Sequence, residues 1–144
     1  MHTPILTAVI ALVLWTFVMW VWLYTTRIPA MTKGGLVYDP NRPASEFMDQ
    51  IPARVRWKAD NYNHLHEQPT IFYAVAIILS MLAAGGGLNA TLAWIYVALR
   101  IAHSLVQALV NIAMLRFLLF AAASLVLFVL TLRAALMLFG GPAG

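Results

Sequence analysis

Four polar side chains share one face of an otherwise apolar stretch in the later half of the sequence. They are Arg100, His103, Gln107 and Asn111. A helix turns about 100° per residue, so these side chains fall within an arc of about 80°. An ionisable side chain inside a membrane-spanning segment is energetically costly and is a candidate functional group. A guanidinium in this position needs either an acidic side chain or an anionic ligand.

A second polar face precedes another apolar stretch. Its members, spaced three or four residues apart, are Arg56, Asp60, Asn63, Glu67 and Thr70. Residues with this spacing lie on one side of a helix. We expect the two polar faces to meet, and we predict an ion pair between Glu67 and Arg100, within the bundle or across subunits. Such a pair either only joins helices or also takes part in ligand binding, and both interpretations stay open.

Arg116 is a third candidate, because no acidic residue lies near it in the sequence. Its side chain either extends to lipid headgroups or holds an anionic ligand. No metal site is predicted, because His64 and His66 are two residues apart and point to different faces of a helix. The chain has no cysteine, which excludes disulfides and thiol redox chemistry of its own.

Membrane-spanning helices must position these side chains. The chain has 144 residues, of which 62% are hydrophobic and 10% charged, whereas charged residues make up about 25% of a soluble domain. So much apolar surface cannot be buried in one small soluble domain. We predict an all-α, integral membrane four-helix bundle that forms a single domain over residues 1–144. Its predicted spans are 4–26, 69–84, 88–110 and 117–139, and residues 27–55 form a loop.

The distribution of lysine and arginine predicts the orientation. Six of the nine lie between residues 27 and 58, and one more, Arg116, lies between the last two spans. Short cytoplasmic loops carry an excess of these residues. The loop and Arg116 should therefore face the cytoplasm and both termini the other side, in what we expect to be a bacterial inner membrane. Acids interleave with the bases in this loop, so no nucleic-acid partner is predicted.

Two segments resemble the MAPEG superfamily, the membrane-associated proteins in eicosanoid and glutathione metabolism. The first is Asn-His-Leu-His-Glu-Gln-Pro at 63–69, and the second runs from Arg-Ile-Ala-His at 100–103 to Arg116. The resemblance implies a homotrimer of four-helix subunits. It also implies that glutathione binds as co-substrate between neighbouring subunits, near the cytoplasmic side. A hydrophobic small-molecule substrate would enter from the membrane lipid.

The resemblance implies roles for individual residues. Arg116 matches an arginine that stabilises the glutathione thiolate in enzymes of this family, and would be the catalytic residue. A guanidinium beside a thiol lowers the thiol pKa from its ordinary value of about 8.5. The implied glutathione-binding residues are Asn63, Glu67, Arg100, His103 and Gln107. Gln107 stands where the eicosanoid enzymes carry a tyrosine.

These observations favour a membrane-bound glutathione-dependent transferase or peroxidase that acts on hydrophobic electrophiles or lipid hydroperoxides. The alternative is a non-catalytic, lipid-binding membrane protein of the same fold. A small multidrug exporter would also have four short spans. Proton-coupled exporters of that kind need an acidic residue in the first span, and residues 5–24 contain none.

Overall fold

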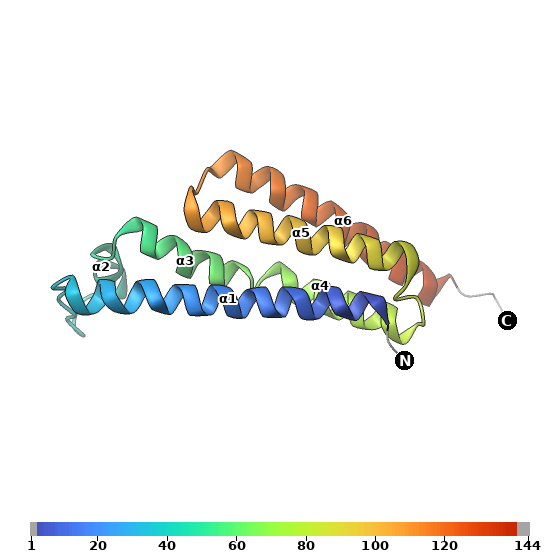
Figure 1. The fold of residues 1–144 in the computed structure, drawn as a ribbon, viewed down its shortest axis with the longest axis horizontal. Helices are drawn as coiled ribbons and strands as arrows, with labels where there is room; N and C mark the ends of the chain where they lie inside the picture. The colour runs from blue at the N-terminus through green and yellow to red at the C-terminus, as the bar shows by residue number, and fades with distance from the viewer. Residues whose placement is uncertain (1–2, 141–144) are drawn as a thin grey trace.

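The computed structural model describes residues 3–140, and in this range all regular secondary structure is helical. Long helices run side by side along one axis, and the first helix begins at the same end of the bundle at which the last helix ends (Figure 1). The helices are α1 (Pro4–Lys33), α2 (Ala44–Asp49), α3 (Ala53–His64), α4 (Gln68–Met81), α5 (Gly87–Leu109) and α6 (Ala113–Phe139).

Helix α1 is longer than the first predicted span. It begins at Pro4, a residue well suited to the first helical turn because proline has no N–H to leave unpaired. It continues through Pro29 to Lys33 and ends at a glycine pair, where Gly35 has a φ of +60°. The loop predicted at 27–55 is therefore shorter, and α2 lies within it.

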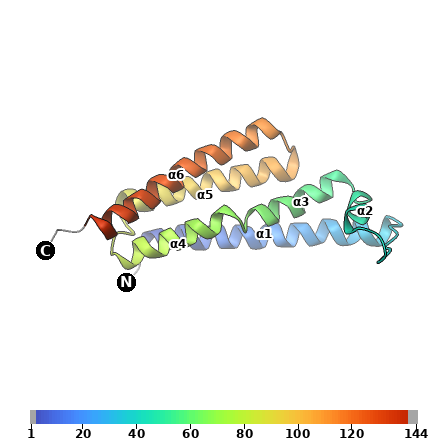
Figure 2. The ribbon, with the colours of Figure 1, turned by 180° about the vertical axis from the view of Figure 1, so that it is seen from behind.

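The polar face predicted over residues 56–70 is divided between two helices. The three- and four-residue spacing predicted one continuous helix, whereas the structure has α3 and α4 with a break at residues 65–67. Pro69 is the second residue of α4 and cannot donate a backbone hydrogen bond. Helix α3 therefore ends before the proline, at His64, and α4 begins at Gln68. The two helices lie end to end alongside α1 (Figure 2).

Helices α5 and α6 form a tight antiparallel hairpin (Figures 1 and 2). Asn111 adopts a φ of +53°, a left-handed conformation that asparagine tolerates better than most residues. This conformation reverses the chain within residues 110–112, and α6 begins four residues earlier than predicted. Arg116 consequently lies one turn inside α6, and its backbone N–H donates to the carbonyl of Ile112 at 3.0 Å.

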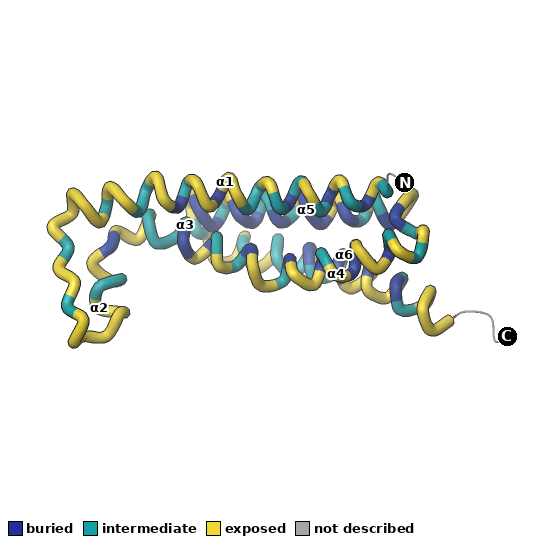
Figure 3. Tube along the Cα trace, turned by 90° about the horizontal axis from the view of Figure 1, so that it is seen from below, coloured by how far each residue is buried: buried dark blue, intermediate teal, exposed yellow. Residues whose placement is uncertain are grey.

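The helices bury one side and expose an apolar outer side. Helix α5 packs against α1, α3 and α6, and α4 packs against α1 and α6. Buried alanines let the helices approach closely, as is usual between membrane helices; they include Ala8, Ala76, Ala93, Ala108 and Ala123. Along α1, buried residues line the inner side and exposed ones the outer side (Figure 3). The exposed residues of α1 include Ile10, Leu14, Phe17 and Val18.

Three helices are long and apolar enough to cross a membrane. They are α1, α5 and α6, with mean hydropathies of 2.3, 1.4 and 2.4. Helix α4 has 14 residues, so it rises only about 21 Å against a hydrocarbon core of about 30 Å. Crossing at this position therefore needs part of the collinear α3.

Candidate functional site

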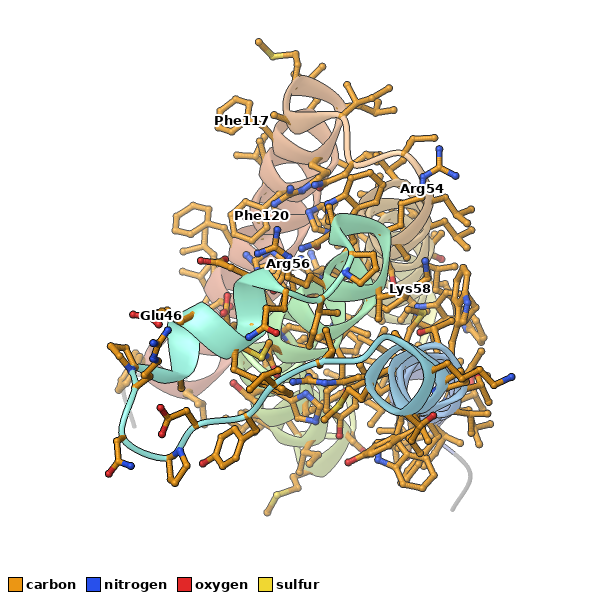
Figure 4. The ribbon with its side chains drawn as sticks, turned by 90° about the vertical axis from the view of Figure 1, so that its left-hand side faces the viewer. Glu46, Arg54, Arg56, Lys58, Phe117 and Phe120 are labelled. Carbon is orange, nitrogen blue, oxygen red and sulfur yellow. The ribbon has the colours of Figure 1, made fainter. Side chains whose placement is uncertain are left out.

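An open pocket of about 240 Å³ lies between α3, α5 and α6, near the α5–α6 turn. It is lined by His64, His103, Ala113, Arg116, Phe117 and Phe120. Figure 4 looks at this end of the bundle and shows Phe117 and Phe120 projecting from α6 toward the side on which α2 lies. The pocket thus combines cationic and aromatic side chains, and no carboxylate lines it.

Arg100 is fully buried on α5 and contacts two of the residues that line the pocket, His64 and Phe120. Its Nη2 donates to the backbone carbonyl of His64 at 3.1 Å. The guanidinium carbon lies 5.8 Å from the centre of the Phe120 ring, within the range of a cation–π interaction. Its Nε and Nη1 have no hydrogen-bond partner in residues 3–140. The buried cation therefore has donors available for a further acceptor.

Three aromatic rings from three helices meet beside Arg100. The His64 ring of α3 stacks on Phe120 of α6, with ring centres 5.5 Å apart and an interplanar angle of 21°. His103 of α5 lies 5.1 Å from His64 and 6.3 Å from Phe120, centre to centre. The contacts hold both imidazoles at the pocket wall.

Arg116 lies at the rim of the pocket, on the first turns of α6. Its Nη1 donates to Oδ1 of Asn111, and its Nε is buried without a partner among the residues described. Backbone N–H groups at a helix N-terminus give this end a partial positive charge. The guanidinium adds a full charge, so an anion is favoured here.

The predicted Glu67–Arg100 ion pair is not formed within the chain. Oε2 of Glu67 instead lies 2.7 Å from Nδ1 of His64. The helix break at residues 65–67 separates Glu67 from α3 and leaves its side chain 66% exposed. The polar face predicted to meet α5 is an outward face, and Asp60, Asn63 and Thr70 are exposed on it.

The other predicted site residues lie in different surroundings. Asn63 is exposed and does not line the pocket. Gln107 is buried one helical turn beyond His103, and its Oε1 has no partner in the described range. The structure therefore brings Arg100, His103 and Arg116 to one place, connects Glu67 to it through His64, and leaves Asn63 outside.

Polar residues that the sequence analysis did not single out face inward from α3 and α4. Nδ2 of Asn61 donates to the Ser104 hydroxyl at 2.6 Å. Nε2 of Gln68 donates to the Ser124 hydroxyl at 2.7 Å, and the Tyr96 hydroxyl donates to Oε1 of Gln68 at 3.3 Å. Asn61, His64 and Gln68 also follow three- and four-residue spacing. That pattern was available in the sequence as a second possible inner face.

A further buried polar contact lies at the opposite end of the bundle. Nε of Arg133 on α6 donates to Oδ1 of Asn89 on α5, and Nδ2 of Asn89 donates to the carbonyl of Ala84 at 2.8 Å. Arg133 is an ionisable residue in an otherwise apolar helix, and no role was predicted for it from the sequence. Its contacts tie α6 to the turn between α4 and α5.

A family model described as the MAPEG family matches residues 5–136. The chain belongs to the MAPEG family. The match confirms the resemblance found in the sequence, and every residue that lines the pocket lies inside the matched range. With three helices suited to cross a bilayer, this MAPEG chain is an integral membrane protein. No curated protein and no solved structure matches it.

Proposed function

We propose that this MAPEG protein is a membrane-bound, glutathione-dependent transferase or peroxidase for hydrophobic electrophiles or lipid hydroperoxides. The observation that carries the proposal is the buried Arg100 guanidinium, two of whose nitrogens have no partner among residues 3–140, beside a pocket lined by Arg116 and His103. Buried polar groups in proteins are normally satisfied. A small anionic ligand would satisfy these donors.

Glutathione fits this requirement because it carries two carboxylates and an ionisable thiol. Guanidinium groups bind carboxylates through charge-assisted hydrogen bonds, so Arg100 and His103 would bind one end of the tripeptide. We further propose that the chain assembles as a homotrimer in which a neighbouring copy covers the outward Asn63 and Glu67. Those residues and Gln107 would then complete the site. Exposed apolar residues along the helices support such packing in addition to lipid contact.

The chemistry proposed for Arg116 is stabilisation of the glutathione thiolate. A free thiol has a pKa of about 8.5, so it is mostly protonated at neutral pH. The Arg116 guanidinium and the N-terminus of α6 both favour the anion. Each unit by which they lower the thiol pKa corresponds to about 1.4 kcal/mol. The electrophile would reach the thiolate from the bilayer past the exposed Phe117.

The test is the substitution Arg116→Ala in detergent-purified protein. We expect conjugation of glutathione to a chlorodinitrobenzene to fall at least about tenfold, the rate factor for one pKa unit. The parent should show thiolate absorbance when glutathione is added, and the variant should not. Arg42→Ala, in the exposed loop before α2, is the matched control and should change neither readout.

Calorimetry distinguishes a glutathione-dependent enzyme from the alternative, a non-catalytic lipid-binding protein of the same fold. The parent should bind glutathione with measurable heat. If millimolar glutathione produces no heat and the parent has no conjugating activity, the transferase proposal fails. Binding of phospholipid or fatty acid under the same conditions would then identify a lipid-binding protein.

A further inference from the structure

We infer that His64, oriented by Glu67, is the base that takes the proton from the thiol in this pocket. The inference rests on the proposed function and assigns a step that Arg116 cannot perform, since an arginine side chain stays protonated. A thiolate forms only if its proton has an acceptor. Of the residues that line the pocket, only His64 and His103 have a side chain able to accept one.

The two histidines differ in their contacts with acidic residues. Nδ1 of His64 lies 2.7 Å from Oε2 of Glu67, whereas His103 has no hydrogen bond or ion pair to an acidic residue in the described chain. A carboxylate at one ring nitrogen holds the proton there and leaves the lone pair of the other nitrogen free. It also stabilises the imidazolium that forms after proton transfer, as in catalytic triads. His64 therefore has the arrangement of a general base and His103 does not.

The position of His64 is held from several sides. Its ring stacks on Phe120, and its backbone carbonyl accepts from Arg100 at 3.1 Å. The helix break after His64 folds Glu67 back onto the ring at a spacing of three residues. The charged and titratable groups that surround the imidazole are Glu67 from the α3–α4 connection, Arg100 and His103 from α5, and Arg116 from α6.

The step balances without another reactant. The thiol proton moves to Nε2 of His64, and the sulfur keeps the electron pair as a thiolate beside Arg116. The sulfur then forms a bond to the electrophilic carbon, and the leaving group departs with the electrons of its own bond. The His64 side chain is 23% exposed, so its proton can pass to water afterwards. In this proton transfer Glu67 acts through the imidazole of His64 and is a positioning residue.

The decisive measurement is the pH profile of glutathione conjugation in His64→Gln. Removal of a general base lowers rates by roughly 100-fold or more, so kcat at neutral pH should fall by about that factor while KM for glutathione changes little. The deficit should shrink as the pH rises toward about 8.5, the ordinary thiol pKa, because the thiol then ionises without His64. Glu67→Gln should give a smaller loss with the same recovery at high pH.

Two further variants separate chemistry from folding. His64→Phe keeps a ring to stack on Phe120 but cannot accept a proton, so it should melt like the parent and show the same loss. His66→Gln is the matched control, because its ring lies 4.6 Å from Tyr62 and it does not line the pocket. That variant should retain the parent's pH profile.

The outcomes distinguish this inference from the function on which it rests. An active parent whose His64→Gln and His64→Phe variants keep its rate and pH profile would overturn the role of His64 and leave the transferase proposal standing. A loss of kcat that stays constant at all pH values would also overturn the role of His64 as a base, since such a loss would indicate a structural role. A parent without activity or thiolate signal would overturn both.

Discussion

Arg100 connects the core of the bundle to the pocket. It is the largest fully buried side chain described, and it lies on the same helical face as His103 and Gln107. Its single hydrogen bond goes to a carbonyl just before the α3–α4 break. The side chain therefore has a structural role even without a ligand, because it satisfies a backbone acceptor at a point where the helix is interrupted.

Arg100→Ala should destabilise the protein by about 2–5 kcal/mol, the range for truncating a large buried side chain. The substitution leaves a cavity beside Phe120 and removes the donor to the His64 carbonyl. The thermal unfolding midpoint in detergent measures the effect. Arg54→Ala, at an exposed position of α3, is the control and should melt like the parent. Equal midpoints for the two variants would contradict a structural role of Arg100.

At the scale of elements, the break between α3 and α4 decides which side chains face inward. An unbroken helix through Pro69 would have aimed Glu67 along the same face as Asn63. The break instead places Gln68 against α5 and α6, where it bonds to Tyr96 and Ser124. The break also brings the carboxylate of Glu67 against the His64 ring. One local interruption therefore positions both the Gln68 hydrogen bonds and the proposed base.

The turn between α4 and α5 is tightly packed at one glycine and open at the next. A Cβ on Gly85 would lie 2.2 Å from Cγ2 of Thr3 and 2.7 Å from Cγ2 of Ile5. The Gly85 carbonyl also accepts from the backbone N–H of Ile5 at 2.8 Å. A Cβ on Gly86 would meet no atom within 4 Å. The start of α1 is thus docked onto Gly85.

Gly85→Ala should lower the free energy of unfolding by about 1–3 kcal/mol, the usual penalty for overpacking a buried position. Gly86→Ala is the matched control and should cost less. Chemical denaturation of both variants in the same detergent gives the comparison. If Gly86→Ala is the more destabilising of the two, α1 does not dock onto this turn as described.

At the scale of the whole molecule, the start of α1 and the end of α6 lie at one end of the bundle and the charged α1–α3 connection lies at the other (Figures 1 and 3). The apolar outer sides of the helices lie between these ends. This arrangement puts the pocket in the half of the molecule nearer the lysines and arginines of residues 27–58. The distribution of positive charge predicts that this half faces the cytoplasm.

Fused reporters test that orientation. Alkaline phosphatase, which folds only outside the cytoplasm, should be active when attached after residue 144 and inactive when inserted at residues 36–42 between α1 and α2. A fluorescent protein that matures in the cytoplasm should give the reverse pattern. An active phosphatase at the inserted position would show that the charge distribution does not set the topology.

Several features followed from the sequence alone. The length of the apolar stretches predicted the long helices, because a membrane-spanning helix needs about 20 apolar residues. The spacing of Arg100, His103 and Gln107 placed them on one face, and all three are buried together in α5. The polar motifs were sufficient to indicate the MAPEG family, to which the chain belongs.

Other features depended on the tertiary structure. The sequence offered two possible inner faces between residues 56 and 70, and only the packing of α3 and α4 against α5 and α6 chose the one with Asn61 and Gln68. The predicted partner of Glu67 was Arg100, and the observed partner is His64. The break at residues 65–67 causes this difference, because it changes the direction of the side chains that follow α3. Ion-pair partners depend on distance in space, which local spacing predicts only while the helix is unbroken.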